Sequence, residues 1–310
     1  MRCDYCYLSQ TGYQFRGGGN CLQYSAEQIE KALSFKRLGG MCFINICAAG
    51  ETLLFKEIVP IIYGLLRQGH LVNIVTNGTM TEQLEEIFKF PRNYRERCAF
   101  VFSYHYLELK RLKKIDEFFN NIEKTKKAGC SFQIKFVAHD SYIPFKDEIK
   151  KICIEKAGAP PQVSIPTDHN NQHHFWSSLT IEDFIETWKD YDSPMLKTEI
   201  NNYMVKQNSF CYAGDWGVTL DLGTGYMWPC FESAENVQNI FNNPDAPIMF
   251  KPIGHDCPHI YCIIVMMTGV FGIMPDVNFP TYAEARDRPE AGWFNPTVKE
   301  ICSFTFAEHP

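Results

Sequence analysis

The sequence predicts an α/β fold in which a partial barrel of parallel strands is followed by a small region rich in cysteine. Three observations predict it. Short apolar runs alternate with helical patterns up to about residue 166, this alternation then stops, and cysteines recur around a hairpin pattern near the end of the chain. Alternating strands and helices require parallel strands joined by helical crossovers. We therefore divide the chain into 1–166, a connecting segment 167–208 and a C-terminal region 209–310.

The apolar runs predict five strands, at 41–47, 70–75, 99–103, 131–137 and 162–165. Helices are expected between them, at 53–68, 81–88, 107–127 and 146–156. Ser25 is expected to cap an earlier helix, and Ser178 or Thr180 a later one that runs to about Asp190. In a barrel of this type the chemistry lies on loops at the carboxyl ends of the strands, where residues 48–51, 76–78 and 103–105 fall.

Composition limits the function. With 310 residues, 45% of them hydrophobic, the chain can bury a large core, and a net charge of −6 gives no electrostatic argument for nucleic acid binding. No charged and apolar leader opens the sequence, and no apolar run reaches the roughly 20 residues of a bilayer helix, so we expect a cytoplasmic protein without a membrane partner. In that compartment thirteen cysteines favour iron–sulfur or zinc sites over disulfides.

The chain opens with a pair of cysteines, Cys3 and Cys6, with Tyr5 between them. A lone C-x-x-C also occurs in redox dithiols and zinc sites. With Met1 and Arg2 before it, the stretch resembles the loop of radical S-adenosylmethionine (SAM) enzymes, C-x-x-x-C-x-aromatic-C, whose three thiolates hold a 4Fe–4S cluster. Cys3 and Cys6 match its second and third cysteines, and Tyr5 its aromatic residue.

The first cysteine of that motif would lie four positions before Cys3, upstream of Met1. The resemblance therefore implies a partial (β/α)6 radical SAM barrel that lacks its first strand, either because an internal methionine is taken as the start or because the chain is a fragment. The alternative is a genuine start at which the two cysteines have no role.

Residues 47–51, which follow the first predicted strand, resemble the family's Gly-Gly-Glu turn, with Ala49, Gly50 and Glu51 in its places. The resemblance implies that exposed backbone carbonyls and Glu51 bind the methionine ammonium of SAM. Alternatively, Glu51 serves only the dipole of the next helix. The resemblance also places Ser103 at the ribose and Lys135 within reach of the SAM carboxylate, although a strand lysine often faces solvent. The family's adenine motif is not evident in 161–166.

Cys211, Gly225 and Cys230 form the frame C-x13-G-x4-C on a predicted hairpin, and Cys257 and Cys262 follow. This resembles the opening of the SPASM and twitch domains, which carry auxiliary iron–sulfur clusters. Four cysteines suffice for one 4Fe–4S cluster, and Cys302 alone is left over, so a twitch-like domain with one cluster fits better than a full SPASM domain. The alternative is a zinc ribbon.

Together these resemblances imply an enzyme that cleaves SAM reductively and abstracts hydrogen from a peptide, protein or small molecule. An electron donor such as flavodoxin or ferredoxin is then expected. Two alternatives belong to other classes. One is a non-catalytic iron–sulfur or zinc scaffold, the inactive remnant of such an enzyme. The other is a zinc hydrolase that uses His169, His173 and His174.

Overall fold

The computed structural model describes residues 1–12, 22–233, 235–255 and 257–306. Its centre is a five-stranded parallel sheet in which the strands follow one another in sequence order, β1-β2-β3-β4-β5. The strands are β1 (Phe43–Ile46), β2 (Leu71–Thr76), β3 (Cys98–Ser103), β4 (Ser131–Val137) and β5 (Gln162–Ser164). The predicted α/β partial barrel is therefore confirmed.

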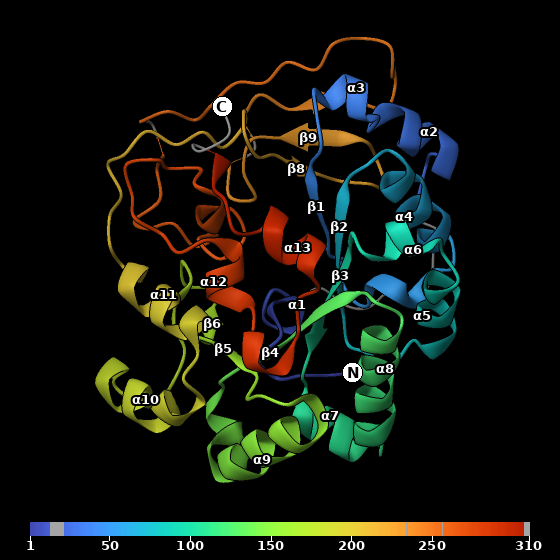
Figure 1. Ribbon diagram of the computed structural model, residues 1–310. Helices are drawn as coiled ribbons and strands as arrows, with labels where there is room; N and C mark the ends of the chain where they lie inside the picture. Colours follow the sequence, from blue (N-terminus) through green and yellow to red (C-terminus); the bar gives the residue numbers. More distant parts are fainter. Residues whose placement is uncertain (13–21, 234, 256, 307–310) are drawn as a thin grey trace.

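One face of the sheet is apolar and packs against the helices between the strands. Ile74, Phe100 and Phe132 lie side by side on neighbouring strands and are almost fully buried. Phe102, on the same face, contacts Phe118 of α8 (Ile115–Lys127) edge to face, with 5.8 Å between the ring centroids. The helices that connect the strands are α4 (Ile58–Arg67), α5 (Thr81–Phe88), α6 (Arg92–Arg95), α7 (Tyr106–Arg111), α8 (Ile115–Lys127) and α9 (Lys146–Ala157). In Figure 1, α4, α5, α6 and α8 lie on one side of the sheet.

The single helix expected over 107–127 is wrong, because α7 and α8 are separate. The chain turns at Lys113, whose φ of 56° is left-handed. Lys114 N donates to Leu109 O at 2.8 Å and Lys113 N to Lys110 O at 3.1 Å. This hydrogen-bond pattern is a Schellman motif, which ends a helix and usually has glycine at the left-handed position. Because lysine stands where glycine is usual, the sequence pattern does not show that the helix ends here.

The other face of the sheet carries polar side chains and lies against the C-terminal part of the chain. Gln133 of β4 accepts a hydrogen bond from Arg286 Nη1 at 3.0 Å and donates one to Tyr282 Oη at 2.7 Å. Both partners belong to α12 (Tyr282–Arg286). Next to it, Phe132 N donates to Trp293 O at 3.0 Å, just before α13 (Pro296–Ile301). In Figure 1, α12 and α13 lie opposite α4, α5 and α6, so the interior of the partial barrel is filled from this side.

Strand β1 forms one edge of the sheet. Within the described residues it pairs with β2 alone, and Phe43, Ile44 and Asn45 remain half-buried.

The connecting segment packs on the opposite edge. It contains the hairpin β6 (Thr167–Asp168) and β7 (His174–Phe175), then α10 (Ile181–Trp188), which Thr180 caps as expected, and α11 (Pro194–Asn202). Glu199 of α11 accepts hydrogen bonds from Ser164 Oγ at 2.9 Å and Ile165 N at 2.7 Å. These bonds fix α11 against the end of β5.

The C-terminal hairpin is shorter than its pattern suggests. It consists of β8 (Thr219–Leu220) and β9 (Tyr226–Trp228), and β10 (Gln238–Asn239) pairs with β9 on the other side. Gly225 has a φ of 77°, and a Cβ there would lie 2.7 Å from Phe241. Glycine is therefore required on steric and conformational grounds.

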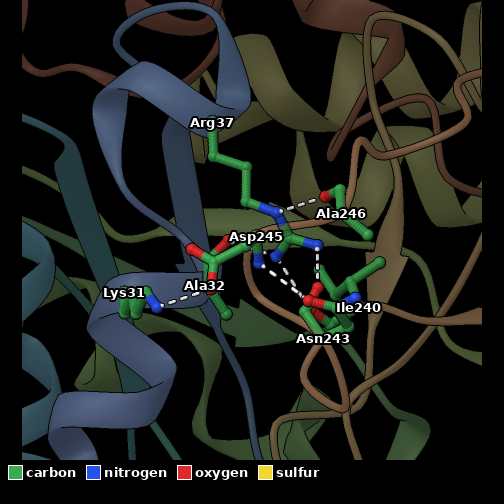
Figure 2. Close-up of polar contacts among 7 residues, drawn as sticks. All are labelled: Lys31, Ala32, Arg37, Ile240, Asn243, Asp245 and Ala246. Carbon is green, nitrogen blue, oxygen red and sulfur yellow. Dashed lines mark hydrogen bonds and ion pairs between the residues drawn. The ribbon is translucent and has the colours of Figure 1, made fainter.

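Arg37 joins the start of the chain to the segment after β10, as Figure 2 shows. It lies on α3 (Phe35–Leu38), directly after α2 (Ala26–Ala32). Its guanidinium donates to Ile240 O at 2.7 Å, Ala246 O at 3.1 Å and Asn243 O at 3.2 Å, and also to Ala32 O at 2.9 Å. One side chain thus satisfies carbonyls from two distant segments. Among the described residues, no helix combines the length and the apolar character needed to cross a bilayer.

Candidate functional site

The turn after β1 is fastened to the loop after β2 by the Glu51 carboxylate. Glu51 Oε1 accepts hydrogen bonds from Thr76 Oγ1 at 2.7 Å and Leu53 N at 3.0 Å, and Oε2 accepts one from Asn77 N at 2.7 Å. Burial raises the pKa of Glu51, and these donors oppose the rise. An ionised carboxylate has about four lone-pair sites, so about one stays open to a further donor such as an ammonium group.

The backbone before Glu51 is presented to the outside. Ala49 and Gly50 are exposed. Gly50 has a φ of 131°, and its N–H donates to Ala48 O at 2.9 Å. Residues with a side chain rarely adopt that backbone conformation, which explains why the turn carries glycine. The predicted ligand turn therefore has accessible backbone together with a fixed carboxylate.

Ser103 and Lys135 are neighbours at the carboxyl ends of β3 and β4. Both are half-buried. Burial lowers the pKa of Lys135, the nearby Glu199 carboxylate raises it and Arg286 lowers it further. These neighbours show that Lys135 faces the interior of the partial barrel and not bulk solvent. Among the described residues, burial and nearby charges act on the Lys135 ammonium group without a hydrogen bond, which leaves the group available to an anionic partner.

The cysteine loop, residues 3–10, lies over the same end of the sheet. Cys6 N donates to Cys3 O at 3.1 Å, and the short helix α1 (Tyr7–Gln10) follows. Cys3 is buried, with 8% of its surface exposed, and burial raises the pKa of its thiol to about 11. Cys6 is half-buried. Because a thiolate is costly in such surroundings, Cys3 would need a cation or metal nearby to ionise.

Tyr5 points its hydroxyl into the loops that follow β3 and β4. Tyr5 Oη lies 2.7 Å from His105 Nδ1 and 2.8 Å from Tyr142 Oη. Its ring also contacts His139 at 5.7 Å between centroids. The aromatic residue between the two cysteines thus has internal polar partners of its own.

The four C-terminal cysteines meet at one pocket, although they are spread over 211–262. This thiol pocket is lined by Cys211, Cys230, Cys257 and Cys262 together with Glu232, His259 and Tyr261. Burial raises the pKa of Cys262 to about 12, and each of the other three thiols raises it further. That mutual effect places all four sulfurs within electrostatic range of one another.

The thiol pocket suits a soft, cationic inorganic group, because such a group supplies the positive charge that four crowded thiolates lack. Within the described residues, no set of three His, Cys, Asp or Glu side chains is gathered closely enough to hold a single metal ion.

The three histidines of the connecting segment lie on the β6–β7 hairpin. The rings of His169 and His173 stand 4.4 Å apart, edge to face, and His173 Nε2 lies 3.5 Å from Glu232 Oε1. Burial lowers the pKa of His169 to about 4, and His173 lowers it further. His174 Nδ1 instead contacts Asn171 O at 2.6 Å. The helical i, i+4 geometry that a zinc site would use is not formed here.

Several residues around these sites were not predicted from the sequence, namely Gln10, Tyr142, Glu199, Glu232 and Arg286. Each acts through a partner more than 27 residues away in the chain. The one local signal was Ser193-Pro194, a favourable start for the helix that carries Glu199.

No protein-family profile and no curated protein sequence matches the chain. Solved structures do match it. SuiB of Streptococcus suis bound to S-adenosylmethionine superposes with a TM-score of 0.55 at 15% identity, over 78% of this chain and 62% of SuiB. SuiB bound to the precursor peptide SuiA superposes with a TM-score of 0.51 at 15% identity, over 78% of this chain and 60% of SuiB. The structure of anSMEcpe with bound AdoMet and Kp18Cys peptide superposes with a TM-score of 0.54 at 17% identity, over 79% of this chain and 75% of anSMEcpe.

These structures are radical SAM enzymes, and the chain shares their α/β partial-barrel fold. Identities of 15–17% establish the fold alone. The chain spans about 62% of the length of the first of them.

Proposed function

We propose that this chain is a radical SAM enzyme with a core over 1–166, a connecting segment over 167–208 and a twitch-like auxiliary domain over 209–310. The observation that carries the proposal is the convergence of Cys211, Cys230, Cys257 and Cys262 on one pocket beside a partial barrel of this fold. Four thiols that line one pocket match the ligand count of a 4Fe–4S cluster.

The core site fits its cofactors in part. Cys3 and Cys6 offer two of the three thiolates that the radical SAM loop uses, and a residue upstream of Met1 would supply the third. A 4Fe–4S cluster and SAM bound there would supply the chemistry of reductive SAM cleavage and hydrogen abstraction from the substrate.

The chain's own residues would hold and orient the ligand. The remaining acceptor position of Glu51 and the exposed backbone at Ala49 and Gly50 would bind the ammonium group of SAM. The inward-facing ammonium of Lys135 would pair with its carboxylate, and Ser103, beside it in register, would contact the ribose. Tyr5 would fix the loop that carries both thiols. Holding the reactants in this way contributes orientation and excludes water.

A peptide is the substrate class that the fold comparison favours, because SuiB and anSMEcpe are described with bound peptides. A protein or small molecule remains within the proposal. A flavodoxin or ferredoxin would supply the electron.

Anaerobic reconstitution tests this function. The chain, extended by its natural upstream codons, is loaded with iron and sulfide, and then incubated with SAM and dithionite. Release of 5′-deoxyadenosine is expected, with loss of release in Glu51→Ala and retention in Glu82→Ala, an exposed glutamate on α5. A fully loaded protein that releases none would contradict the proposal.

The second candidate is a non-catalytic iron–sulfur or zinc scaffold. It is favoured by the buried state of Cys3 and by the unpaired edge of β1 among the described residues. A chain that loads the thiol pocket but never cleaves SAM would support it.

A further inference from the structure

The β6–β7 hairpin lies between the two cysteine regions and contacts both. On one side, Gln10 of the cysteine loop donates from Nε2 to Thr167 O at 3.2 Å, and its Oε1 accepts from His169 N at 2.7 Å. Asn170 Nδ2 donates to Gln10 O at 2.8 Å. Gln10 Nε2 also donates to Tyr5 O at 3.1 Å, so these contacts reach the backbone between the two thiols.

On its other side the hairpin contacts the thiol pocket. His173 Nε2 lies 3.5 Å from Glu232 Oε1, with 17% and 20% of the two side chains exposed. The carbonyl of His173 accepts a hydrogen bond from Tyr261 Oη at 2.7 Å. Glu232 and Tyr261 both line the pocket, two residues after Cys230 and one before Cys262. A single residue of the hairpin therefore holds two segments that carry pocket cysteines.

The tip of the hairpin is strained. Gln172 and His173 have φ values of 48° and 58°, two consecutive non-glycine residues in the left-handed region. Such residues persist only where their surroundings impose the conformation. Here the surroundings are the contacts of His173 with Glu232, Tyr261 and the His169 ring. Anything that loosens the pocket residues therefore weakens the constraint on the hairpin.

We propose that the β6–β7 hairpin is a positioning element that holds the cysteine loop in register with the thiol pocket, with Gln10 and His173 as its two anchoring residues. The inference rests on the proposed function, since it assumes that an iron–sulfur group fills the pocket. Filling the pocket fixes Glu232 and Tyr261, which stabilises the hairpin and through Gln10 orders residues 3–12. Such coupling between sites is reciprocal.

Hydrogen exchange read by mass spectrometry tests this on the chain as it stands, before and after anaerobic loading with iron and sulfide. The amides of Ser9, Gln10 and Thr11 report the cysteine loop, because each is hydrogen-bonded within it. Loading is expected to slow their exchange by about 5-fold or more, the lower range of such couplings. Peptides from 211–262 should be protected as well, and iron per chain is counted separately.

Two variants break the connection from opposite ends. His173→Asn keeps a residue that tolerates the left-handed conformation but removes the imidazole, and Gln10→Leu removes the side-chain bonds to Thr167 and His169. Each is expected to load iron and protect 211–262 while the slowing at residues 9–11 is lost. His174→Asn is the matched control, because the hydrogen bond found for its imidazole among the described residues goes to Asn171 O and reaches neither cysteine region. Unchanged exchange in β2, β3 and β4 shows that each variant remains folded.

The outcomes separate the two claims. Iron in the pocket without any slowing at residues 9–11, or with equal slowing in both variants, overturns the positioning role and leaves the proposed function in place. A pocket that takes up no iron overturns both.

Discussion

The Tyr5 hydroxyl lies 2.7 Å from His105 Nδ1 and ties the cysteine loop to the residues that follow β3. Burial lowers the pKa of His105 to about 4, so the ring is neutral near pH 7 and Nδ1 can accept the phenol proton in a hydrogen bond. Tyr142 Oη, 2.8 Å away, completes the arrangement. Because Tyr5 stands between Cys3 and Cys6, this pair fixes the backbone that carries both thiols.

Tyr5→Phe should lower the free energy of unfolding by about 1–3 kcal/mol, because it leaves His105 and Tyr142 without a shared partner in a buried place. Urea denaturation followed by circular dichroism measures the change. Tyr24→Phe is the matched control, since that hydroxyl contacts Asn242 at an exposed position. Equal losses in the two variants would contradict the role given to Tyr5.

Acid should weaken the fold through His105. Its pKa falls from 6.5 to about 4 on folding, so the unfolded chain takes up the proton first as pH drops. Stability is then complete above pH 6.5 and declines between pH 6.5 and about 4, by on the order of 3 kcal/mol from this group. Unfolding midpoints measured between pH 7.5 and 5 should shift less in His105→Gln. An unchanged pH dependence in that variant would show that His105 does not titrate in this way.

Glu51→Gln tests the turn after β1. An amide has one carbonyl oxygen for the three donors that the carboxylate now accepts, so Asn77 N or Thr76 Oγ1 loses its partner. We expect a loss of about 1–3 kcal/mol in unfolding free energy and weaker binding of SAM, measured by titration calorimetry on loaded protein. Glu82→Gln, whose side chain is 84% exposed, should leave both quantities unchanged.

Substitution of the pocket cysteines should remove iron selectively. Cys230→Ser and Cys262→Ser are each expected to lose the auxiliary cluster, a decrease of about four iron atoms per chain. Cys302→Ala is the control, because Cys302 is fully buried and does not line the pocket. If Cys302→Ala lost as much iron as the two serine variants, the assignment of ligands would be wrong.

Arg37 and Lys31 give a second matched comparison, visible in Figure 2. Arg37→Ala leaves four carbonyls without their donor and should cost about 2–4 kcal/mol, with faster amide exchange over 240–246. Lys31→Ala removes only an exposed ion pair with Asp245, which is worth about 0–1 kcal/mol. Similar effects of the two changes would contradict this comparison.

Local patterns predicted the parts of this molecule that depend on local chemistry. The parallel sheet followed from strand and helix periodicity, and α5 and β4 begin and end at the predicted residues. The resemblance to SPASM and twitch domains implied a common site for the four C-terminal cysteines, and all four line one pocket, but their role as metal ligands stays a prediction. The domain boundaries and the individual ligand contacts stay predictions.

Other features depend on contacts that no local pattern encodes. The end of α7 at Lys113 uses a residue with no preference for that conformation. The β6–β7 hairpin is held by Gln10 and Glu232, which lie over 50 residues away on either side. Lys135 was ambiguous in sequence, because its direction depends on α11 and α12 packing against the end of the sheet.

The central claim is that cysteines at both ends of this chain hold iron. It is tested most directly by counting iron and acid-labile sulfide in protein purified anaerobically with its natural upstream codons. We predict about eight iron atoms and about eight sulfides per chain, the content of two 4Fe–4S clusters. The reduced protein is expected to give the electron paramagnetic resonance signal of such clusters. A colourless protein without iron and sulfide, or one that carries zinc alone, would contradict the account.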